Sequence, residues 1–259
     1  MSISALPEPI KKIVRPLYYF LFRVKIALYA KLYRSKISDG FSVPIIINNF
    51  NRVTYLRQLV ESLESRGYHN IYIIDNASTY PPLLKFYDSC KYKVFRLKEN
   101  FGFRAFWESG IYKNFLKDYY VYTDSDVVPC NECPNDFLDT FLKQMKKDNT
   151  IFKIGMGLKI DDLPECFANK GDVLEWEAQY HKNIYDAQFF EANVDTTFAL
   201  YRPGLKQSAN LYVKMLRSRA PIEAYHLPWY SDSKNLSEED VYYIMHAKKS
   251  THWTAINTK

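Results

Sequence analysis

The stretch YYVYTDSD, residues 119–126, joins an apolar and aromatic run to two carboxylates, Asp124 and Asp126. Three earlier apolar runs also lead to a short polar residue: VPIII (43–47) leads to Asn49, IYIID (71–75) ends at Asp75, and YKVFRL (92–97) leads to Asn100. From Asn49 to Asp124 these polar residues recur every 24 to 26 residues. Repeated strand-helix units have this spacing, and their crossovers make neighbouring strands parallel. Ligands bind at the edge where the carboxyl ends of such strands meet, so we expect an α/β fold with a binding site there.

Helices are expected between and after these runs. After Asn51, apolar residues lie at helical spacing and Gly67 is placed to end their helix: Leu56, Leu59, Val60 and Leu63. Residues 103–116 are expected to form the third crossover helix, although Gly110 disfavours a helix there. Beyond the acidic motif, a further amphipathic helix is predicted from residues that share one face: Phe137, Leu138, Phe141, Leu142 and Met145.

The length sets the expected domain organisation. A chain of 259 residues can bury a full core as one domain, or as one half with a smaller appended half. We expect an N-terminal segment, residues 1–39, followed by one α/β domain, residues 40–259. Within that domain, residues 40–130 hold the four runs and residues 131–259 form the second half.

The cysteines indicate a reducing compartment. Four of them form no disulfide pattern in a chain of this size, and no cleavable signal peptide is recognisable. Cys130 and Cys133 have the spacing of half a zinc site or of a redox pair, but no second pair or nearby histidine completes either. We therefore favour free thiols and a cytoplasmic protein.

The net charge of +6 lies entirely in residues 1–39, where two acidic residues oppose eight basic ones: Lys11, Lys12, Arg15, Arg23, Lys25, Lys31, Arg34 and Lys36. The remainder of the chain is neutral, so we do not expect it to bind nucleic acid. Within the segment, LYYFLFRVKIALYAKLY (17–33) mixes large apolar residues with cations, and no uncharged stretch approaches the ~20 residues of a spanning helix. We favour a helix lying on the anionic, cytoplasmic face of a membrane. The alternative is a helix that docks on the domain or on a second copy of it, as in a homo-oligomer.

The acidic motif is predicted to bind a metal. Two carboxylates at alternate positions of a strand point the same way and can hold a hard divalent cation, which neutralises a diphosphate. Many surface turns contain an Asp-x-Asp triplet, but this one follows the apolar and aromatic run of residues 119–122 at a fourth strand end. That position favours a functional site over a solvated turn.

Together these motifs resemble the family 2 glycosyltransferases of the GT-A fold, through most of residues 43–253. The similar segments are VPIIINNFNR for the first strand and turn, IYIIDNAST for the second strand with its base-recognising aspartate, KENFGF for an Asn-x-Gly turn, and TDSD for the metal-binding Asp-x-Asp. In the second half GLKIDDLP, VDTTFALYRP and HLPWY resemble a bacterial subgroup of these enzymes. The resemblance implies a Rossmann-like mixed sheet flanked by helices, with residues 40–130 binding the nucleotide sugar and residues 131–259 binding the acceptor.

The resemblance also implies a reaction and a donor site. It implies metal-dependent, inverting transfer of a sugar from a nucleoside-diphosphate sugar, with UDP as the default nucleotide and Mn²⁺ or Mg²⁺ as the cofactor. Asp126 is expected to bind the metal directly, with Asp124 at the ribose or metal-bound water and His226 as a further ligand or a core histidine beside Trp229. Arg104 is expected either at the donor or in a structural ion pair. The implied donor-binding residues are Asn49, Asn51, Arg52, Asp75, Asn76, Asn100, Arg104, Asp124 and Ser125.

Inversion requires a general base for the acceptor hydroxyl. We favour Asp195, which follows a short extended stretch, over a role for it as a capping residue. Glu191, Glu223 and Asp240 are the reserves, since the family's usual Glu-Asp pair is not obvious and residues 238–240 lie after HLPWY. Aromatic rings stack on sugars, so the acceptor platform is predicted from Trp176, Trp229 and Tyr230. The acceptor implied by the resemblance is a glycan or lipid-linked glycan of the lipopolysaccharide type.

Two alternatives belong to other classes of protein. VYTDSDVV also resembles the nucleophile motif of haloacid-dehalogenase phosphatases, with Asp161 and Asp162 as a second metal pair. That motif belongs on the first strand, whereas three strand units precede it here. The other alternative is a glycosyltransferase-like binding module without catalysis, which anchors an assembly at the membrane.

Overall fold

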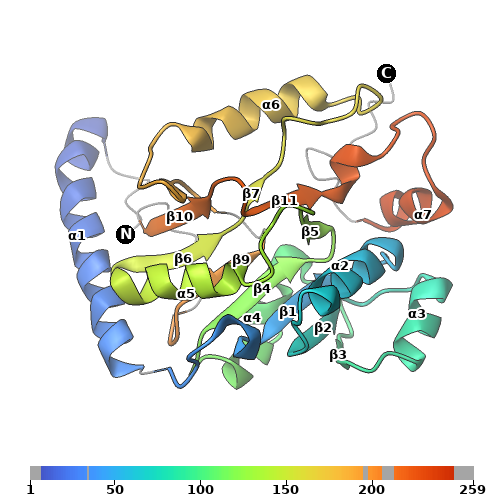
Figure 1. Ribbon diagram of the computed structural model, residues 1–259, viewed down its shortest axis with the longest axis horizontal. Coiled ribbons are helices and arrows are strands. Elements are labelled where there is room, and N and C mark those ends of the chain that lie inside the picture. The colour runs from blue at the N-terminus through green and yellow to red at the C-terminus, as the bar shows by residue number, and fades with distance from the viewer. Residues whose placement is uncertain (1–6, 34, 195–197, 206–212, 248–259) are drawn as a thin grey trace.

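One mixed sheet runs through the computed structural model, which describes residues 7–33, 35–194, 198–205 and 213–247. Its eight strands are, in spatial order, β3 (Lys93–Arg96), β2 (Ile71–Asp75), β1 (Ile45–Asn49), β4 (Tyr120–Asp124), β9 (Ala199–Tyr201), β6 (Ile151–Gly155), β10 (Lys214–Ser218) and β8 (Phe189–Glu191). A smaller sheet has the order β5 (Val127–Pro129), β11 (Glu223–His226) and β7 (Gly157–Leu158). The two expected halves, 40–130 and 131–259, therefore share one large sheet (Figure 1).

The four strands expected from the apolar runs are confirmed as parallel neighbours. β2 pairs with β3 and β1, and β1 pairs with β4, all in parallel. In this register Asn49 lies opposite Asp75, and Asn48 lies opposite Asp124. Asn49, Asp75 and Asp124 are the last residues of their strands, whereas Asn100 lies beyond the end of β3. Beyond β4 the sheet becomes mixed, since β9 runs antiparallel to both β4 and β6.

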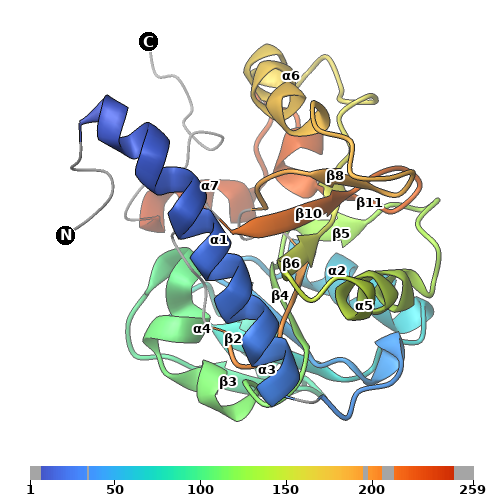
Figure 2. The same cartoon turned by 90° about the vertical axis from the view of Figure 1, so that its left-hand side faces the viewer.

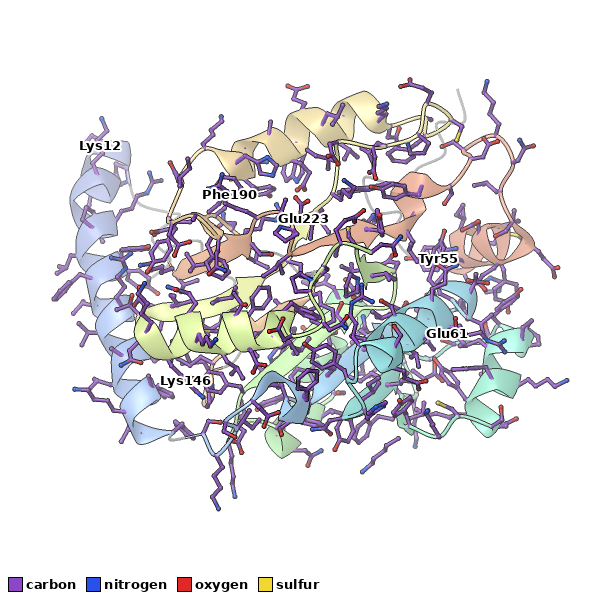
Figure 3. The ribbon with its side chains drawn as sticks, viewed as in Figure 1. Lys12, Tyr55, Glu61, Lys146, Phe190 and Glu223 are labelled. Atoms are coloured by element: carbon purple, nitrogen blue, oxygen red, sulfur yellow. The ribbon has the colours of Figure 1, made fainter. Side chains whose placement is uncertain are left out.

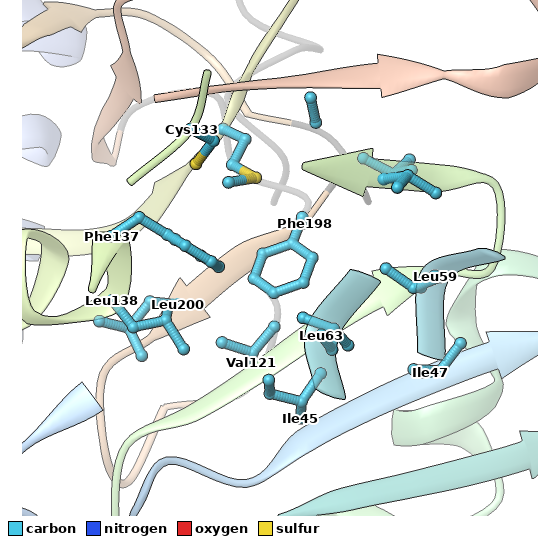
Figure 4. Close-up of a cluster of buried hydrophobic side chains, with 14 of the residues drawn as sticks. Ile45, Ile47, Leu59, Leu63, Val121, Cys133, Phe137, Leu138, Phe198 and Leu200 are labelled. Atoms are coloured by element: carbon cyan, nitrogen blue, oxygen red, sulfur yellow. The ribbon is translucent and has the colours of Figure 1, made fainter. Parts of the chain in front are cut away.

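The predicted amphipathic helices cover one face of this sheet. These are α2 (Thr54–Ser65) and α5 (Phe137–Lys147), and α3 (Pro81–Asp88) follows β2. The apolar residues predicted for α2 and α5 are all buried, and the chain leaves α2 through Gly67 with a positive φ of 91°. Figure 4 shows side chains of β1, α2, β4 and α5 meeting around Phe198, just before β9.

The single helix expected over residues 103–116 is wrong. The segment instead forms three short turns of helix: η3 (Gly102–Arg104), α4 (Ala105–Glu108) and η4 (Ile111–Asn114). Gly110 adopts the left-handed conformation, with φ of 82°, and breaks the helix where it was expected to weaken it. The segment still packs its aromatic side chains on the sheet, and Trp107 is buried against Tyr122 and Tyr201.

Helix α1 (Glu8–Leu32) docks on the domain. Ile26 is fully buried in a core cluster that also contains Phe152 of β6 and Met215 of β10. Tyr33 lies so close to Gly204 that a Cβ there would be 2.5 Å from its ring. Figure 2 shows α1 running across one side of the molecule. In the part of the chain described here, no helix is long and apolar enough to cross a membrane.

Two ion pairs anchor the second half. Arg217 of β10 and Glu177 of α6 (Lys170–Ala178) lie 2.9 Å apart and are almost completely buried, which fixes α6 over the edge of the sheet. Lys214 Nζ lies 2.7 Å from Asp148 Oδ2 and so ties β10 to the end of α5. The remaining elements are α7 (Glu238–His246), η2 (Gly40–Ser42), η5 (Gln179–His181) and η6 (Leu227–Tyr230).

The cysteines are free thiols, as expected. Cys130 and Cys133 are buried behind the small sheet, and burial raises the pKa of each thiol to about 12. Thiolates are the nucleophilic form of cysteine, so burial makes both thiols less reactive.

Candidate active site

The polar ends of the parallel strands form two groups on opposite faces of the sheet, because successive side chains of a strand alternate. On one face Asn48 Nδ2 donates a hydrogen bond to Asp124 Oδ1 (3.2 Å). On the other face Asn49 Nδ2 donates to the Tyr87 hydroxyl (2.9 Å), while its Oδ1 is buried without a hydrogen-bond partner among the described residues. Asn49 therefore does not face the acidic motif, although its backbone lies at the same edge.

Asp75 ends β2 on the same face as Asn49. It is almost completely buried, and its Oδ1 accepts a hydrogen bond from the Ser78 backbone N–H (3.0 Å). Burial raises the Asp75 pKa above its ordinary value, although the hydrogen bonds from Ser78 oppose the shift. Asn51 caps the same loop, since its Oδ1 accepts from the backbone N–H groups of Thr79 (2.7 Å) and Tyr80 (3.0 Å).

Hydrogen bonds hold the Asn-x-Gly turn after β3 against the residue that follows β2. Asn76 Nδ2 donates to the Gly102 carbonyl (2.9 Å), and Asn76 Oδ1 accepts from the Phe101 N–H (2.9 Å). Within the turn, Asn100 Oδ1 accepts from the Gly102 N–H (2.7 Å). Asn76 and Asn100 thus shape this part of the edge. Arg104, just beyond, makes an exposed ion pair with Glu108 (3.0 Å), which corresponds to the structural alternative for this residue.

The acidic motif crosses from the large sheet to the small one. Asp124 is the last residue of β4, whereas Ser125 and Asp126 form the turn that leads into β5. Asp126 Oδ2 lies 3.7 Å from His226 Nε2, at the end of β11, and the Asp126 carbonyl accepts a hydrogen bond from the Leu227 N–H (2.8 Å). The His226 ring lies 4.6 Å from that of Trp229, which is the neighbour expected for a core histidine. Ser125 is buried, and its backbone N–H donates to the Asn48 carbonyl (3.1 Å).

The chemistry of these residues suits a divalent cation. Among the described residues, no three His, Cys, Asp or Glu side chains are arranged to hold a metal by themselves. Asp126 Oδ1 is, however, buried without a hydrogen-bond partner in this part of the chain, beside the imidazole of His226. Mg²⁺ is commonly bound by one or two carboxylates together with substrate phosphates, and carboxylate and imidazole groups both suit Mn²⁺. The sequence pattern suggested that the two aspartates share one face of a strand. They do not, because Asp126 lies beyond the end of β4.

Arg52 is buried at this edge in an ion pair. Its Nη1 contacts Asp240 of α7, and its guanidinium lies over the rings of Tyr55 (4.9 Å) and Tyr243 (4.1 Å). The Tyr55 hydroxyl is 3.1 Å from Ser231 Oγ, and Figure 3 places Tyr55 between α2 and α7. Arg52 is thus at the predicted edge, but its charge is already paired.

The candidates for the general base occupy very different places. Asp195 lies outside the described residues. Glu191 is on the edge strand β8, where it accepts hydrogen bonds from the Tyr19 hydroxyl (3.0 Å) and Arg23 (3.4 Å) of α1. Glu223 is on β11 but, by strand alternation, points away from the face of His226. Burial and then the charge of Asp161 raise the Glu223 pKa.

Asp240, the third reserve base, lies on α7 and is paired with Arg52. Burial favours its neutral form, but hydrogen bonds from Ser237 and the charge of Arg52 outweigh burial and lower its pKa. A carboxylate held in this way is a weak base. Its contacts fit a structural role better than proton transfer.

The three residues predicted to form the acceptor platform lie in different parts of the structure. Trp229 is buried, with 2% of its surface exposed, and packs in the main core. Tyr230 is partly buried, and its hydroxyl donates to Asp162 Oδ1 (2.6 Å). Trp176 on α6 is half exposed. Of the three rings, Trp176 offers the largest open surface.

Sequence reasoning missed four residues of this edge. Asn48 was overlooked because only the register of β1 on β4 shows that it faces Asp124. Tyr55, Glu239 and Tyr243 were missed because α7 reaches the edge only through tertiary folding. The capping pattern of Ser237 and Asp240 was the one local signal that a helix begins there.

The comparison with protein families identifies the chain. The model described as glycosyl transferase family 2 matches residues 45–203, more than half of the chain. The chain belongs to glycosyl transferase family 2. The matched range of this glycosyltransferase contains the polar strand ends and the acidic turn, whereas His226 and α7 lie beyond it. Its central mixed sheet with flanking helices is that of the GT-A fold, as expected, and the phosphatase alternative is not supported.

Matches among solved structures include a mannosyltransferase. S. aureus TarS is 14% identical, with a TM-score of 0.45, over 71% of this chain and 36% of that one, so this chain spans about a third of its length. The TarS fragment 1–349 is 13% identical, with a TM-score of 0.44, over 72% of this chain and 60% of the fragment. The mannosyltransferase PcManGT from Pyrobaculum calidifontis, in complex with GDP-Man and Mn²⁺, is 13% identical, with a TM-score of 0.45, over 92% of this chain and 76% of that one. Among curated proteins no match is found.

Proposed function

We propose that this glycosyltransferase is a metal-dependent, inverting enzyme that moves a hexosyl group from a nucleoside-diphosphate sugar to a glycan or lipid-linked glycan acceptor. The observation that carries the proposal is the pairing of Asp126 with His226 beside the aligned ends of β1, β2 and β4. In this arrangement the polar strand ends lie between a proposed nucleoside-binding side and a proposed metal-binding side. Family membership supports sugar transfer as the chemistry.

The metal-binding side would stabilise the negative charge of the diphosphate leaving group. Asp126 and His226 are the residues that hold the cation, with Asp124 held close by through Asn48. A divalent cation supplies charge stabilisation to a departing diphosphate without any proton transfer. The nucleoside side consists of Asp75, Asn76 and the turn that Asn76 holds, whose amide and carboxylate groups suit hydrogen bonding to a base and ribose. UDP is our default nucleotide.

The acceptor side requires a base, and Asp195 remains our proposal for it. It belongs to the connection between β8 and β9, and β9 is the direct neighbour of β4 in the sheet. The Glu191 carboxylate already accepts a hydrogen bond from Tyr19 of α1, and the Asp240 carboxylate is paired with Arg52. Both are therefore weaker candidates for the general base than Asp195. Trp176 is our candidate for a sugar-stacking surface on this side.

We also propose that α1 places the enzyme on an anionic membrane surface at the cytoplasmic face. The side of α1 opposite Ile26 exposes an apolar stripe along the whole helix: Ile10, Leu17, Phe20, Leu21, Val24, Leu28 and Leu32. Monomeric proteins rarely expose large contiguous apolar patches without a binding role. Lys31 lies on the same side of α1 as the stripe, so anionic lipid complements the charge of the segment, whereas a second copy would oppose one basic helix with another.

The reaction is tested by measuring release of nucleoside diphosphate from a panel of nucleotide sugars with and without Mn²⁺. We expect metal-dependent release from one donor, faster in the presence of acceptor. A thermal-shift screen of the same panel identifies the donor, because a ligand at 100 times its Kd stabilises by about 2.7 kcal/mol. Binding without release under any condition would instead support a non-catalytic binding module.

A further inference from the structure

The side-chain amide of Asn48 lies between the acidic motif and the turn that follows β3. Its Nδ2 donates hydrogen bonds to Asp124 Oδ1 (3.2 Å) and to the Gly102 carbonyl (3.4 Å). Asn48 can reach both because β1 lies between β2 and β4 in the sheet. Both hydrogens of the amide nitrogen therefore have an acceptor, one in the acidic motif and one in the turn.

These two partners fix the orientation of the amide. Asp124 Oδ1 and the Gly102 carbonyl both accept hydrogen bonds, so a reversed amide would place oxygen against oxygen. The amide oxygen of Asn48, Oδ1, is left buried without a hydrogen-bond partner among the residues that the structure describes, and only 8% of this residue is exposed. Buried acceptors in native proteins almost always have a partner, so this oxygen calls for a donor group that arrives with a ligand.

The turn that Asn48 contacts is also held from the end of β2. Asn76 Nδ2 donates to the same Gly102 carbonyl (2.9 Å), and Asn76 Oδ1 accepts from the Phe101 N–H (2.9 Å). These bonds make the turn a fixed support for the Asn48 amide. Asn48 therefore joins Asp124 to the nucleoside side of the site.

Asn48 and Asp124 together present two neighbouring acceptors. The Oδ1 and Nδ2 atoms of Asn48 share one carbon, so the unpaired oxygen lies beside the carboxylate that Nδ2 contacts. Asp124 is only partly buried, which gives a ligand at the strand edge access to this pair. The oxygens of a diphosphate accept hydrogen bonds, whereas the two adjacent hydroxyl groups of a ribose can donate them. Ribose is therefore the part of the donor that complements the two acceptors.

We propose that Asn48 binds the ribose of the donor nucleotide: its Oδ1 accepts a hydrogen bond from one ribose hydroxyl, and its Nδ2 holds Asp124 in place beside it. The inference rests on the proposed function, since it takes a nucleoside diphosphate as the ligand. It adds a binding residue that the sequence pattern did not indicate. Its consequence is selectivity for a nucleotide that carries the contacted hydroxyl over the corresponding deoxy analogue.

Calorimetric titration of the full chain, with Mn²⁺ present, tests this selectivity. The probes are UDP, GDP and CDP beside their 2′-deoxy and 3′-deoxy forms, and dTDP beside its 3′-deoxy form. Wild-type protein should bind the preferred diphosphate about tenfold or more tightly than the analogue without the contacted hydroxyl, because that analogue leaves a buried acceptor unpaired. Asn48→Ala removes this acceptor and should reduce the ratio of the two Kd values about fivefold or more.

Asn70→Ala is the matched control. Asn70 immediately precedes β2, at the opposite end of the parallel strands, and its Nδ2 donates to the Ser42 carbonyl (2.9 Å). The same substitution there removes a side-chain amide and one hydrogen bond without touching the carboxyl edge. It should leave every Kd and the ratio unchanged.

The outcomes separate this inference from the proposed function. If wild-type protein binds none of the diphosphates, the proposed function fails and the inference fails with it. If wild-type protein binds one of them within about twofold of its deoxy forms, only the inference is overturned, and this result needs no variant. Equal weakening of the hydroxylated and deoxy forms in Asn48→Ala also overturns it, because the residue would then only shape the edge. An unchanged ratio with weaker Mn²⁺ binding would assign the amide oxygen to the cation instead.

Discussion

The Oδ2 atom of Asp126 and the Nε2 atom of His226 lie 3.7 Å apart, joining the turn after β4 to the end of β11. If these residues hold the metal, Asp126→Ala and Asp126→Asn should both abolish sugar transfer and metal-dependent donor binding. His226→Ala should weaken metal binding without abolishing it, since one ligand of the set remains. Loss of the free Mn²⁺ signal in electron paramagnetic resonance, recorded with the nucleoside diphosphate present, measures both effects.

Asp161→Ala is the matched control for this metal test. Asp161 is an exposed carboxylate paired with Lys159 on the second half of the chain. Its replacement should leave the Mn²⁺ titration unchanged. A wild-type titration in either Asp126 variant, or full turnover with chelator present, would show that the metal assignment is wrong.

The identity of the general base is the site prediction that a single variant can most readily refute. Asp195→Asn keeps the shape of the side chain but cannot accept a proton, so turnover should fall by ~10²–10⁴ while donor affinity hardly changes. Glu191→Gln serves as the comparison: its carboxylate is held by Tyr19 and Arg23, so we expect a small loss of thermal stability and near-normal turnover. More than about a tenth of wild-type turnover in Asp195→Asn, where base loss predicts at least a hundredfold fall, would exclude it as the base.

The ion pair of Asp148 and Lys214 predicts a pH-dependent stability. Burial opposes ionisation of Asp148, but the bonds from Lys214 and Thr150 outweigh burial and hold its pKa well below the ordinary value of about 3.9. A depressed pKa adds stability that is fully present above the unfolded value and is lost as pH falls toward the folded value. Asp148→Asn should therefore cost about 2 kcal/mol of unfolding free energy at pH 7 and progressively less below pH about 4. Urea unfolding of both proteins across that range measures the difference, and a constant difference would contradict the prediction.

The sequence was sufficient for the parallel half of the fold because its signals are local. Each of the four parallel strands is a short apolar run, and α2 and α5 carry their apolar residues at helical spacing. The positions of Asp75, Asn76 and Asp124 at the strand ends follow from the same pattern, so this part of the candidate site could be predicted from the sequence. The broken helix at Gly110 shows the limit, since one left-handed residue replaces a crossover helix by short turns.

The remainder of the site depends on contacts between distant segments. The approach of His226 to Asp126 needs the antiparallel pairing of β11 with β5, which no periodicity predicts. The ion pair between Arg52, a predicted donor-binding residue, and Asp240 of α7 likewise joins segments that are far apart in the sequence. Trp229 was predicted as an acceptor platform from its type alone, and burial in the core is what aromatic residues usually achieve.

The two faces of α1 allow a sharp test of membrane binding. Deleting residues 1–39 is unsuitable, because Ile26 and Tyr33 pack on the domain and their loss would expose its core. The triple variant of Leu17, Leu21 and Leu28 to Ser changes only the exposed face and should keep the melting temperature. We expect it to bind anionic phospholipid vesicles at least about tenfold more weakly, and wild-type binding to weaken as salt rises.

Ile26→Ser is the matched control on the docking face, where burial predicts a loss of about 3 kcal/mol of stability. Co-sedimentation with phosphatidylserine and phosphatidylcholine vesicles measures binding, and a triple variant that still binds but changes from dimer to monomer would assign the stripe to a second copy.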